Sequence, residues 1–480
     1  MSIQGAQQFV FGFWQGRTVS IEAVEKPLSS DGGLFVFGQL DEKLDWTASF
    51  ARQIGGARSG RVHSVLDIIR QRVFGIIAGY EDQNDHDTLR SDPIFKLLAQ
   101  RHPTEDEDLA SQPTISRLEN AVTAADLLRL EDWFIDRFVA SFEEEPRELT
   151  LDIDTFDDPT HGTQQLTFFH DFYEQHQYQV RAITCANNDM LVFPVLLYGT
   201  APVALGAAAD LRRVIERLRS RFGDIKIHVR ADAGFASPEI YETLEQLNVT
   251  FSIGFTLNSK LQRLSAELRE NTTLAHQTSG QPEIRYQLVE DYRAKNWSRS
   301  RTIVVKCEVT AHSTTRRAVI TNRTGALVSP EGAYCEYADR GESENRNKEL
   351  KCEFRADRLS DHRYMANLFR LMMHCLANNL LVAMRRLVAD PPKAPTVNGV
   401  PPEASLPRQK RRMHNERRKQ DPLGEGYACT WRTYVIKVAT RVVISVRRVC
   451  LQLSASWPHL EYLTKVARAI ADFSPFAPSG

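Results

Sequence analysis

The spacing of hydrophobic residues changes near residue 148 of the chain. Before that point, Val62–Gly75 and Ala124–Phe142 carry apolar residues three and four positions apart, which is typical of amphipathic helices. The first 148 residues are therefore predicted to be mostly helical. Between these two helices, Leu109–Val122 predicts a shorter one, with Ser111 as its cap and Pro113 in its first turn.

This short helix has two interpretations. Ser116, Arg117 and Asn120 would project polar groups from it, as a recognition helix does in the major groove of DNA. A connecting helix with a capped start has the same sequence features. The pattern alone leaves both interpretations open.

After residue 148 the spacing becomes that of strands. The segment ELTLDIDTFDD places Leu149, Leu151 and Ile153 on one face and ends in carboxylates, which predicts a half-buried strand. Two more strands follow, and then a helix, a strand, a helix and a strand. The predicted elements are, in chain order, Glu148–Asp158, Gln179–Ala186, Met190–Tyr198, Val203–Phe222, Ile225–Arg230, Pro238–Leu247 and Thr250–Gly254. This succession is that of a ribonuclease H-like fold, a mixed α/β sheet with helices on its faces.

Three carboxylates are placed for metal chemistry in such a fold. The first and fourth strands are neighbours, so Asp154 and Asp232 would lie side by side, and Glu344 on a later helix could close over them. Two-metal phosphoryl transfer needs acidic side chains that bridge ions roughly 3.5–4 Å apart, and carboxylate oxygens suit a hard cation such as Mg²⁺. Taken singly, Asp154 is equally a turn residue at a strand end, and Asp232 a loop residue before Gly234.

The stretch YADRGESENRNKELK carries a second pattern. Tyr337, Arg340, Glu344 and Lys351 stand three, four and seven positions apart. One helical face would therefore carry Arg340, Glu344 and Lys351. A solvated ladder of ion pairs is one interpretation of this face. The other is a metal-binding Glu flanked by groups that grip a phosphodiester backbone.

This spacing matches the Tyr-Arg-Glu-Lys signature, and the chain resembles the DDE transposases of bacterial insertion sequences, in particular the family typified by insertion sequence 1380. The resemblance runs from about Gly33 to Tyr462. The matching stretches are RQRVFGIIAGYEDQNDHDTLRSDP, ELTLDIDTFDDPTHGTQQ, VRADAGFASPEIYE, ENRNKELKCEFRADRLSDHRYMANLFRLMMH and SASWPHLEYL. The resemblance implies cut-and-paste transposition by metal-dependent DNA cleavage and strand transfer, with Mg²⁺ as the cofactor and Mn²⁺ as a substitute.

The resemblance also implies roles for single residues. The implied catalytic and metal-binding residues are Asp154, Asp232 and Glu344. The implied DNA-binding residues beside them are Tyr337, Arg340 and Lys351. Asp154 is preferred to Asp152, Asp157 and Asp158 because Thr155 follows it, as a Thr commonly does in this family.

The implied partners are double-stranded DNA, both element ends and target, and a second protomer in a homodimer formed on DNA. Two other functions stay open. One is a ribonuclease H-like structure-specific nuclease that does not transfer strands. The other is a domesticated, non-catalytic DNA-binding protein, against which the intact acidic triad argues.

The interval between Asp232 and Glu344 is longer than one helix and one strand require. The strands predicted within it are Ile284–Val289, Thr302–Thr310 and Arg317–Asn322. Trp297 stands there between Lys295 and Arg299, where it would either stack on an unpaired base or cover the inserted sheet.

The C-terminal part is cationic. Ser360–Val388 predicts a long helix with Ser360 as its cap, and six prolines between 391 and 407 predict a flexible linker. Residues 405–480 hold fourteen Lys or Arg and five Asp or Glu, although the net charge of the whole chain is −1. This asymmetry predicts a polyanion partner. The basic cluster expected to contact DNA comprises Arg408, Lys410, Arg411 and Arg412.

Composition excludes several other classes. A chain of 480 residues, 42% hydrophobic and 25% charged, predicts a soluble protein of several domains. It contains neither a bilayer-length apolar run nor a signal pattern, so a bacterial cytoplasmic location is expected. Seven scattered cysteines without a CxxC pair indicate neither a zinc site nor a disulfide framework. The predicted division is a helical, DNA-binding domain at 1–148, a catalytic core at 149–260 and 335–390, a β-rich insertion at 261–334, a linker at 391–407 and a basic region at 408–480.

Overall fold

The computed structural model describes residues 9–11, 15, 19–21, 23–24, 26–55, 62–323, 329–390 and 416–474. The predicted proline linker lies outside these residues, as do Arg408, Lys410, Arg411 and Arg412. Within the described ranges, no helix combines the length and the hydropathy needed to cross a bilayer.

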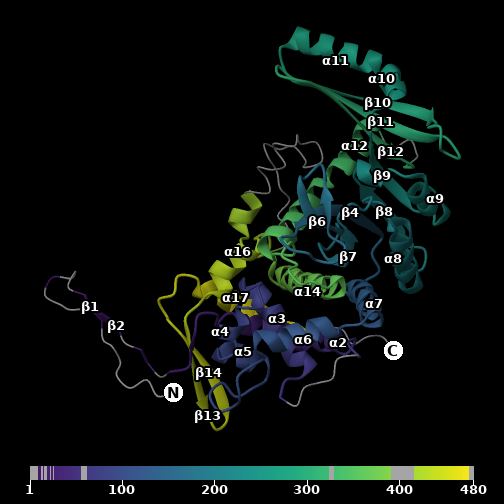
Figure 1. The fold of residues 1–480 in the computed structure, drawn as a ribbon. Coiled ribbons are helices and arrows are strands. Elements are labelled where there is room, and N and C mark those ends of the chain that lie inside the picture. Colours follow the sequence, from purple (N-terminus) through teal and green to yellow (C-terminus); the bar gives the residue numbers. More distant parts are fainter. Residues whose placement is uncertain are drawn as a thin grey trace.

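A nine-stranded mixed sheet forms the centre of the molecule (Figure 1). Its strand order is β10-β11-β12-β9-β8-β4-β6-β5, and β7 pairs with β6 as well. The strands are β4 (Glu148–Pro159), β5 (Phe168–His170), β6 (Gln175–Cys185), β7 (Leu191–Tyr198), β8 (Lys226–Ala231), β9 (Thr250–Phe255), β10 (Glu283–Tyr292), β11 (Arg301–Val309) and β12 (Thr314–Thr321). A short separate pair consists of β1 (Phe9–Phe11) and β2 (Val19–Ile21).

Strand β4 lies in the interior of the sheet. It pairs antiparallel with β6 and parallel with β8, and β8 pairs parallel with β9. The alternating residues Leu149, Leu151 and Ile153 are all buried, which confirms the predicted strand. Ile153 pairs with Ala231, so the first and fourth predicted strands are neighbours, as expected.

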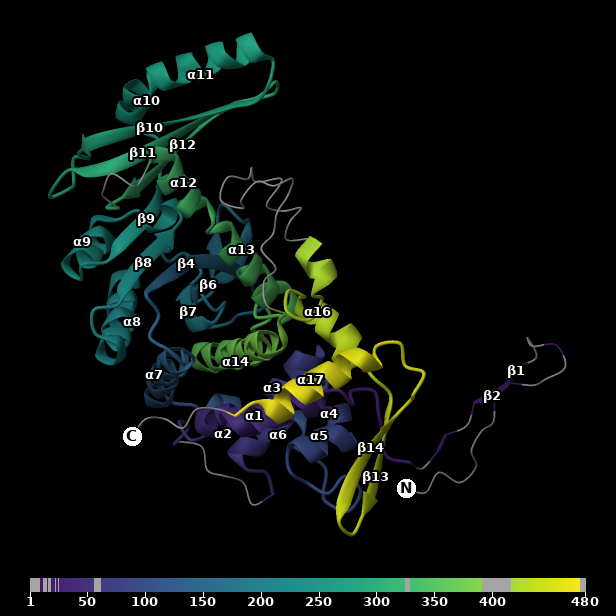
Figure 2. The ribbon, with the colours of Figure 1, turned by 180° about the vertical axis from the view of Figure 1, so that it is seen from behind.

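Helices connect and cover the strands. α8 (Ala207–Phe222) joins β7 to β8, and α9 (Pro238–Gln246) joins β8 to β9. The buried stripe of α8, with Leu211, Val214 and Leu218, follows the predicted helical spacing. The longest helix, α14 (Tyr364–Val388), lies between the sheet and a layer of N-terminal helices (Figures 1 and 2).

The N-terminal layer contains seven helices within the described residues. They are α1 (Leu34–Leu44), α2 (Trp46–Ala51), α3 (Val65–Ala78), α4 (His86–Leu89), α5 (Pro93–Leu98), α6 (Gln112–Ala121) and α7 (Ala124–Ala140). The two long helices predicted from apolar spacing correspond to α3 and α7. Each begins with a capping box, Ser64 with Asp67 and Thr123 with Asp126, in which side chains satisfy the free amides of the first turn.

The β-rich insertion extends the central sheet. β12 pairs antiparallel with β9, and β11 and β10 follow outward. Two helices that the sequence analysis did not predict, α10 (Ser259–Leu264) and α11 (Ala266–Ser279), lie beside this extension (Figure 1). In α11 the buried residues are Leu268 and Thr272, and a pattern of one apolar and one polar position gives no periodic signal.

The C-terminal segment packs against the N-terminal helices. β13 (Thr440–Ser445) pairs with β14 (Arg448–Leu453) and with β3 (Leu28–Ser29). Two helices, α16 (Ala428–Trp431) and α17 (Leu460–Asp472), complete it, and the buried ring of Trp431 lies 5.8 Å from that of Phe37. The described part of the basic region therefore packs against the N-terminal layer.

Candidate active site

The three predicted carboxylates come from two neighbouring strands and one helix. Asp154 lies in β4, and Asp232 follows directly after β8. Asp232 caps a short turn, where its Oδ1 accepts a hydrogen bond of 2.8 Å from the amide of Gly234. Glu344 lies in α13 (Gly341–Lys348), which packs against β4. The pairing of β4 with β8 and the packing of α13 on β4 therefore bring the backbone segments that carry these residues together.

Asp154 is the buried member of this group. Burial raises the pKa of Asp154 to about 6, while the Arg340 guanidinium and the Thr155 amide oppose that rise. The carboxylates of Asp232 and Glu344 raise the pKa of Asp154 further. A carboxyl in such surroundings is stabilised in its charged form by a nearby cation.

Arg340 supplies a positive charge at this point. Its Nη1 donates a hydrogen bond of 3.1 Å to Oδ2 of Asp154, and its Nη2 donates one of 2.9 Å to Oε1 of Glu344. Burial lowers the pKa of Arg340, but the surrounding anions, including Asp232, raise it above its usual value. The guanidinium therefore lies where the negative charges converge.

Tyr337, in α12 (Pro330–Ala338), borders the same group. The guanidinium carbon of Arg340 lies 6.0 Å from the centroid of its ring. Burial raises the pKa of Tyr337, so its hydroxyl is protonated at neutral pH and available as a donor. A Cβ at Gly254 of β9 would lie 2.7 Å from this hydroxyl oxygen, so a glycine is required there.

Lys351 contacts the same strand, β4, as Arg340 does. The residues after α13 form a π-helical turn, Glu349–Glu353, which changes the angular spacing of the side chains. Its Nζ donates a hydrogen bond of 2.6 Å to Oδ1 of Asp157. Burial alone would raise the pKa of Asp157, but this contact holds it below its usual value. The ion pair expected between Arg340 and Glu344 is present, and Lys351 faces the same strand, β4, through Asp157.

Asp152, the nearest alternative to Asp154 as a metal ligand, already forms an ion pair within the protein. Both of its oxygens accept hydrogen bonds from Arg230, at 2.6 and 2.7 Å, and both side chains are buried. Sequence reasoning missed this role of Arg230. A signal was present, because an arginine inside the buried strand IKIHVR needs an anionic partner.

Asp158, another competitor, is fully buried, and neither carboxylate oxygen has a hydrogen-bond partner among the described residues. Burial, and then the charge of Asp357, hold the pKa of Asp158 well above its usual range. These surroundings favour the neutral carboxylic acid. The charges that act on Asp158 are those of Asp357, Lys351 and Asp157, and neither Asp232 nor Glu344 is among them.

The donor set of the site suits a metal ion in charge and in chemistry. Among the described residues, no group of three or more His, Cys, Asp and Glu side chains is already arranged to hold one. The guanidinium of Arg340 bridges Asp154 and Glu344 and stands in for a cation. Oxygen donors of this kind prefer hard divalent ions. The chemistry of these donors therefore suits such an ion, although Arg340 now lies between Asp154 and Glu344.

Trp297 is placed away from solvent. Its side chain is 4% exposed and packs against the rings of Tyr241, Phe255 and Tyr292 at 5.5 to 5.6 Å, with the Arg301 guanidinium at 5.3 Å. An enclosed ring has no free face for a base. The base-stacking expectation is corrected accordingly, and the alternative, a residue covering the inserted sheet, agrees with the structure.

The predicted recognition helix, α6, is anchored to α14. Its Glu119 accepts a hydrogen bond from Arg370 of α14, and its Asn120 donates one of 2.9 Å to Asp361. Arg117 stays exposed. These contacts agree with the connecting-helix interpretation and leave one face of the helix in solvent.

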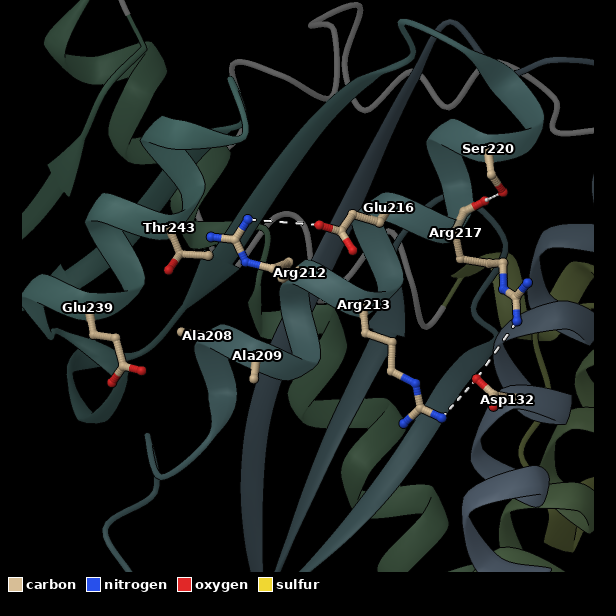
Figure 3. A pocket seen from close by; sticks show the side chains of 10 residues that line it. All are labelled: Asp132, Ala208, Ala209, Arg212, Arg213, Glu216, Arg217, Ser220, Glu239 and Thr243. Carbon is tan, nitrogen blue, oxygen red and sulfur yellow. Dashed lines mark hydrogen bonds and ion pairs between the residues drawn. The ribbon is translucent and has the colours of Figure 1, made fainter.

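A hollow of about 630 Å³ lies between α7, α8 and α9 (Figure 3). It is lined by Asp132, Ala208, Ala209, Arg212, Arg213, Glu216, Arg217, Ser220, Glu239 and Thr243. Arg213 and Arg217 both form ion pairs with Asp132. None of the three carboxylates lines this hollow, so it is separate from the candidate active site.

Comparisons with known proteins identify the family of this chain. The family model described as transposase DDE domain group 1 matches residues 11–397. Among solved structures, the cryo-EM structure of a piggyBac transposase synaptic complex with hairpin DNA is similar, with 12% sequence identity, a TM-score of 0.40, and coverage of 95% of this chain and 89% of that chain. No curated protein matches. Because the family match spans most of the chain, this protein belongs to the transposase DDE domain group 1 family and is a DDE transposase, an enzyme that acts on DNA.

Proposed function

We propose that this transposase moves an insertion sequence of the 1380 type by a cut-and-paste reaction in the site of Asp154, Asp232 and Glu344. The observation that carries the proposal is the contact of Asp154 and Glu344 with the guanidinium of Arg340, whose pKa the charge of Asp232 also raises. A surface ladder of ion pairs would not include a buried carboxyl with a pKa of about 6.

The catalytic core is proposed to be ribonuclease H-like. The path β7-β6-β4-β8-β9, antiparallel on one side of β4 and parallel on the other, supports this assignment. The strands β10 to β12, which lie in the chain between this core and α13, support an insertion at 261–334. The N-terminal helical layer is proposed to bind DNA.

The three carboxylates are proposed to hold Mg²⁺, with Mn²⁺ as a substitute. Bound there, the ions would stabilise the attacking and leaving oxygens of a phosphodiester. The fork of Arg340 suits a phosphate, and the protonated hydroxyl of Tyr337 can donate a hydrogen bond to one. Lys351 supplies a point charge after exchanging Asp157 for phosphate.

In the proposed reaction, water attacks the phosphodiester at the element's end and frees a 3′-hydroxyl. That hydroxyl attacks target DNA in the same site. Excision needs cuts at two ends and one chain carries one site, so the active species is proposed to be a homodimer on double-stranded DNA in the bacterial cytoplasm. Contacts of Arg408, Lys410, Arg411 and Arg412 with DNA stay a prediction from charge alone.

The test uses end DNA identified from inverted repeats in the sequence flanking the gene. We expect cleavage and joining with Mg²⁺ or Mn²⁺ and none with a chelator. Asp232→Ala and Glu344→Ala are each expected to abolish cleavage while DNA binding survives. Cleavage without joining would favour the structure-specific nuclease. Wild-type cleavage by either variant would remove that residue from the site.

A further inference from the structure

The hairpin formed by β13 and β14 extends from the N-terminal layer, at the end of the molecule away from the inserted strands β10 to β12 (Figures 1 and 2). Its two strands pair from Thr440 with Leu453 to Ser445 with Arg448. Its base is joined to β3, which pairs with Thr440 and Arg441. Beyond these residues, and within the described part of the chain, the hairpin is a two-stranded ribbon.

The two faces of this ribbon differ. Directly opposite residues of an antiparallel pair share one face of the sheet. On one face Val442 is buried, and Ile444 and Leu451 pack against the core. The other face is open to solvent. Its exposed residues are Arg441, Ser445, Arg448, Cys450 and Gln452.

The cations of this stretch divide between the protein and the solvent. Residues 426–460 contain five Lys or Arg and no Asp or Glu. Arg432 donates hydrogen bonds to backbone carbonyls of α3, and Lys437 forms an ion pair with Asp31. The other three cations are exposed and have neither an ion pair nor a side-chain hydrogen bond among the described residues. They are Arg441, Arg447 and Arg448. Cations grouped without anions attract a polyanion.

The shape of the ribbon fits a groove of double-stranded DNA. The major groove is about 12 Å wide, admits a two-stranded β-ribbon and displays a distinct pattern of donors and acceptors for each base pair. Gln452 stands opposite Arg441 in the hairpin, and side chains in such positions begin about 5 Å apart. Base pairs follow one another every 3.4 Å or so along the duplex. Two neighbouring base pairs are therefore within reach of these two side chains.

We propose that the exposed face of the β13–β14 hairpin enters the major groove of double-stranded DNA and reads its sequence. Arg441 contacts a guanine and Gln452 contacts an adenine of a neighbouring base pair, because guanidinium and amide groups each form two hydrogen bonds with these bases. Arg447, in the turn, and Arg448, beside it, contact phosphates and fix the position of the hairpin. Arg448 and Gln452 are four residues apart on β14, which is roughly 13 Å, so the face covers about four base pairs.

Two other partners fit the hairpin less well. An anionic membrane attracts cations, but binding in its surface uses a broad apolar face, and the exposed large apolar residues of the hairpin are Val446 and Val449. An acidic protein would satisfy the charges and leave the pairing of Gln452 with Arg441 without a purpose. The chain belongs to a family of enzymes that act on DNA, which favours the duplex.

This inference deepens the proposed function and rests on it for its purpose, which is to hold DNA at a distance from the bond that is cut. The hairpin contains none of the three carboxylates and lies beyond the N-terminal helices as seen from β4 (Figures 1 and 2). Its contact with DNA can be measured in a chelator, where the proposed reaction does not run. A failure of the contact and a failure of the reaction can therefore be told apart.

The experiment selects the duplexes that the full chain binds from a pool with a random centre, in a chelator. The wild type is expected to enrich a site with guanine and adenine at neighbouring base pairs, each preferred about tenfold or more. Arg441→Lys keeps the charge but loses the paired donors of the guanidinium, so it should lose the preference for guanine and still bind DNA. Gln452→Ala should lose the preference for adenine and keep that for guanine.

The turn is tested through the salt dependence of binding. Arg447→Ala/Arg448→Ala should weaken binding of selected and unselected duplexes alike and lower the slope of log K against log salt by nearly two units. The matched control is Arg219→Ala/Arg221→Ala, which removes two guanidinium groups from the last turn of α8 and should change neither the slope nor the selected site. Thermal melting shows whether each variant is folded.

Several results would overturn the inference. They are a wild type that selects no site, an unchanged site in both Arg441→Lys and Gln452→Ala, and an equal loss of all sequences in Arg441→Lys. A turn variant with unchanged DNA binding that no longer binds phosphatidylserine vesicles or polyglutamate would assign the hairpin to a membrane or to an acidic protein. Cleavage of end DNA is measured separately, and its absence in the wild type counts against the proposed reaction and not against the contact.

Discussion

Asp152 and Asp154 are two residues apart on β4, and each faces a guanidinium, yet their surroundings differ. Both carboxylate oxygens of Asp152 accept hydrogen bonds from Arg230, of 2.6 and 2.7 Å, and both side chains are buried. One carboxylate oxygen of Asp154 accepts a hydrogen bond of 3.1 Å from Arg340, and the charges of two further carboxylates raise the pKa of Asp154. The first pair is matched in charge and geometry, whereas the second leaves an excess of negative charge.

This difference separates a structural ion pair from a site that can bind a cation. Removing one partner of a matched buried pair leaves an uncompensated charge in the interior, which is strongly destabilising. A buried carboxyl among like charges is itself unfavourable when ionised, and a cation relieves it. Removing the carboxylate charge should therefore lower the stability of the protein at Asp152 and the rate of DNA cleavage at Asp154.

The largest effect is expected from Asp154→Asn. The substitution keeps the size of the side chain but removes the charge that a metal ion would need, so DNA cleavage should fall at least about 10³-fold. The measurement is cleavage of end DNA in Mg²⁺, with DNA binding followed in parallel. Cleavage near the wild-type rate would transfer the role of Asp154 to another carboxylate, with Asp152 the first to examine.

The next effect concerns stability and the matched pair. Asp152→Ala leaves Arg230 buried without its anion, and the free energy of unfolding should fall by about 3–5 kcal/mol. Urea denaturation measures it. The control is Arg52→Ala, which removes an exposed ion pair with Asp45 and should change the free energy by less than about 1 kcal/mol. Equal effects of the two substitutions would contradict the comparison.

The pH dependence of stability sharpens the contrast in metal-free protein. Because the pKa of Asp154 is raised to about 6 from 3.8, the folded state holds this proton more tightly than the unfolded state does. Its contribution is therefore most favourable below about pH 4 and is lost as the pH rises to 6. Relative to Asp154→Asn, the wild type should lose about 2–3 kcal/mol between pH 4 and pH 7. Urea denaturation of both proteins in a chelator at each pH measures this difference, and parallel curves would contradict it.

Much of the frame around the site could be predicted from local patterns. The alternation at Leu149, Leu151 and Ile153 predicts β4, and the succession of elements predicts that Asp154 and Asp232 lie on neighbouring strands. The pairing of β4 with β8 agrees with both expectations, although β4 continues past Asp154 to Pro159. These signals are readable because burial on a regular strand or helix repeats at a fixed period along the chain.

The remaining features depend on contacts that no local pattern contains. The π-helical turn at Glu349–Glu353 arises in a run of ordinary helix formers, so the turn itself has no sequence signal. β13 pairs with β3 across roughly 400 residues of chain, and such pairing is set by tertiary packing. Trp297 stands between two cations in the sequence, yet the fold encloses its ring.

The smallest expected effect concerns DNA binding. It should involve Arg340 and Lys351, the cations of the candidate site, and not Arg230, which is paired with Asp152. Arg340 and Lys351 are held by Asp154, Glu344 and Asp157, so binding of phosphate exchanges one anion for another and the net gain in affinity is modest. Arg340→Ala and Lys351→Ala should each weaken binding of end DNA several-fold and lower the slope of log K against log salt by nearly one unit. Fluorescence anisotropy at four salt concentrations measures the slope.

Arg221→Ala, which removes an exposed guanidinium from α8, is the control and should leave the slope unchanged. An unchanged slope in both site variants would mean that these residues form only a solvated ladder of ion pairs. The carboxylates would then keep their proposed role, and the grip on phosphate would have to come from elsewhere in the chain.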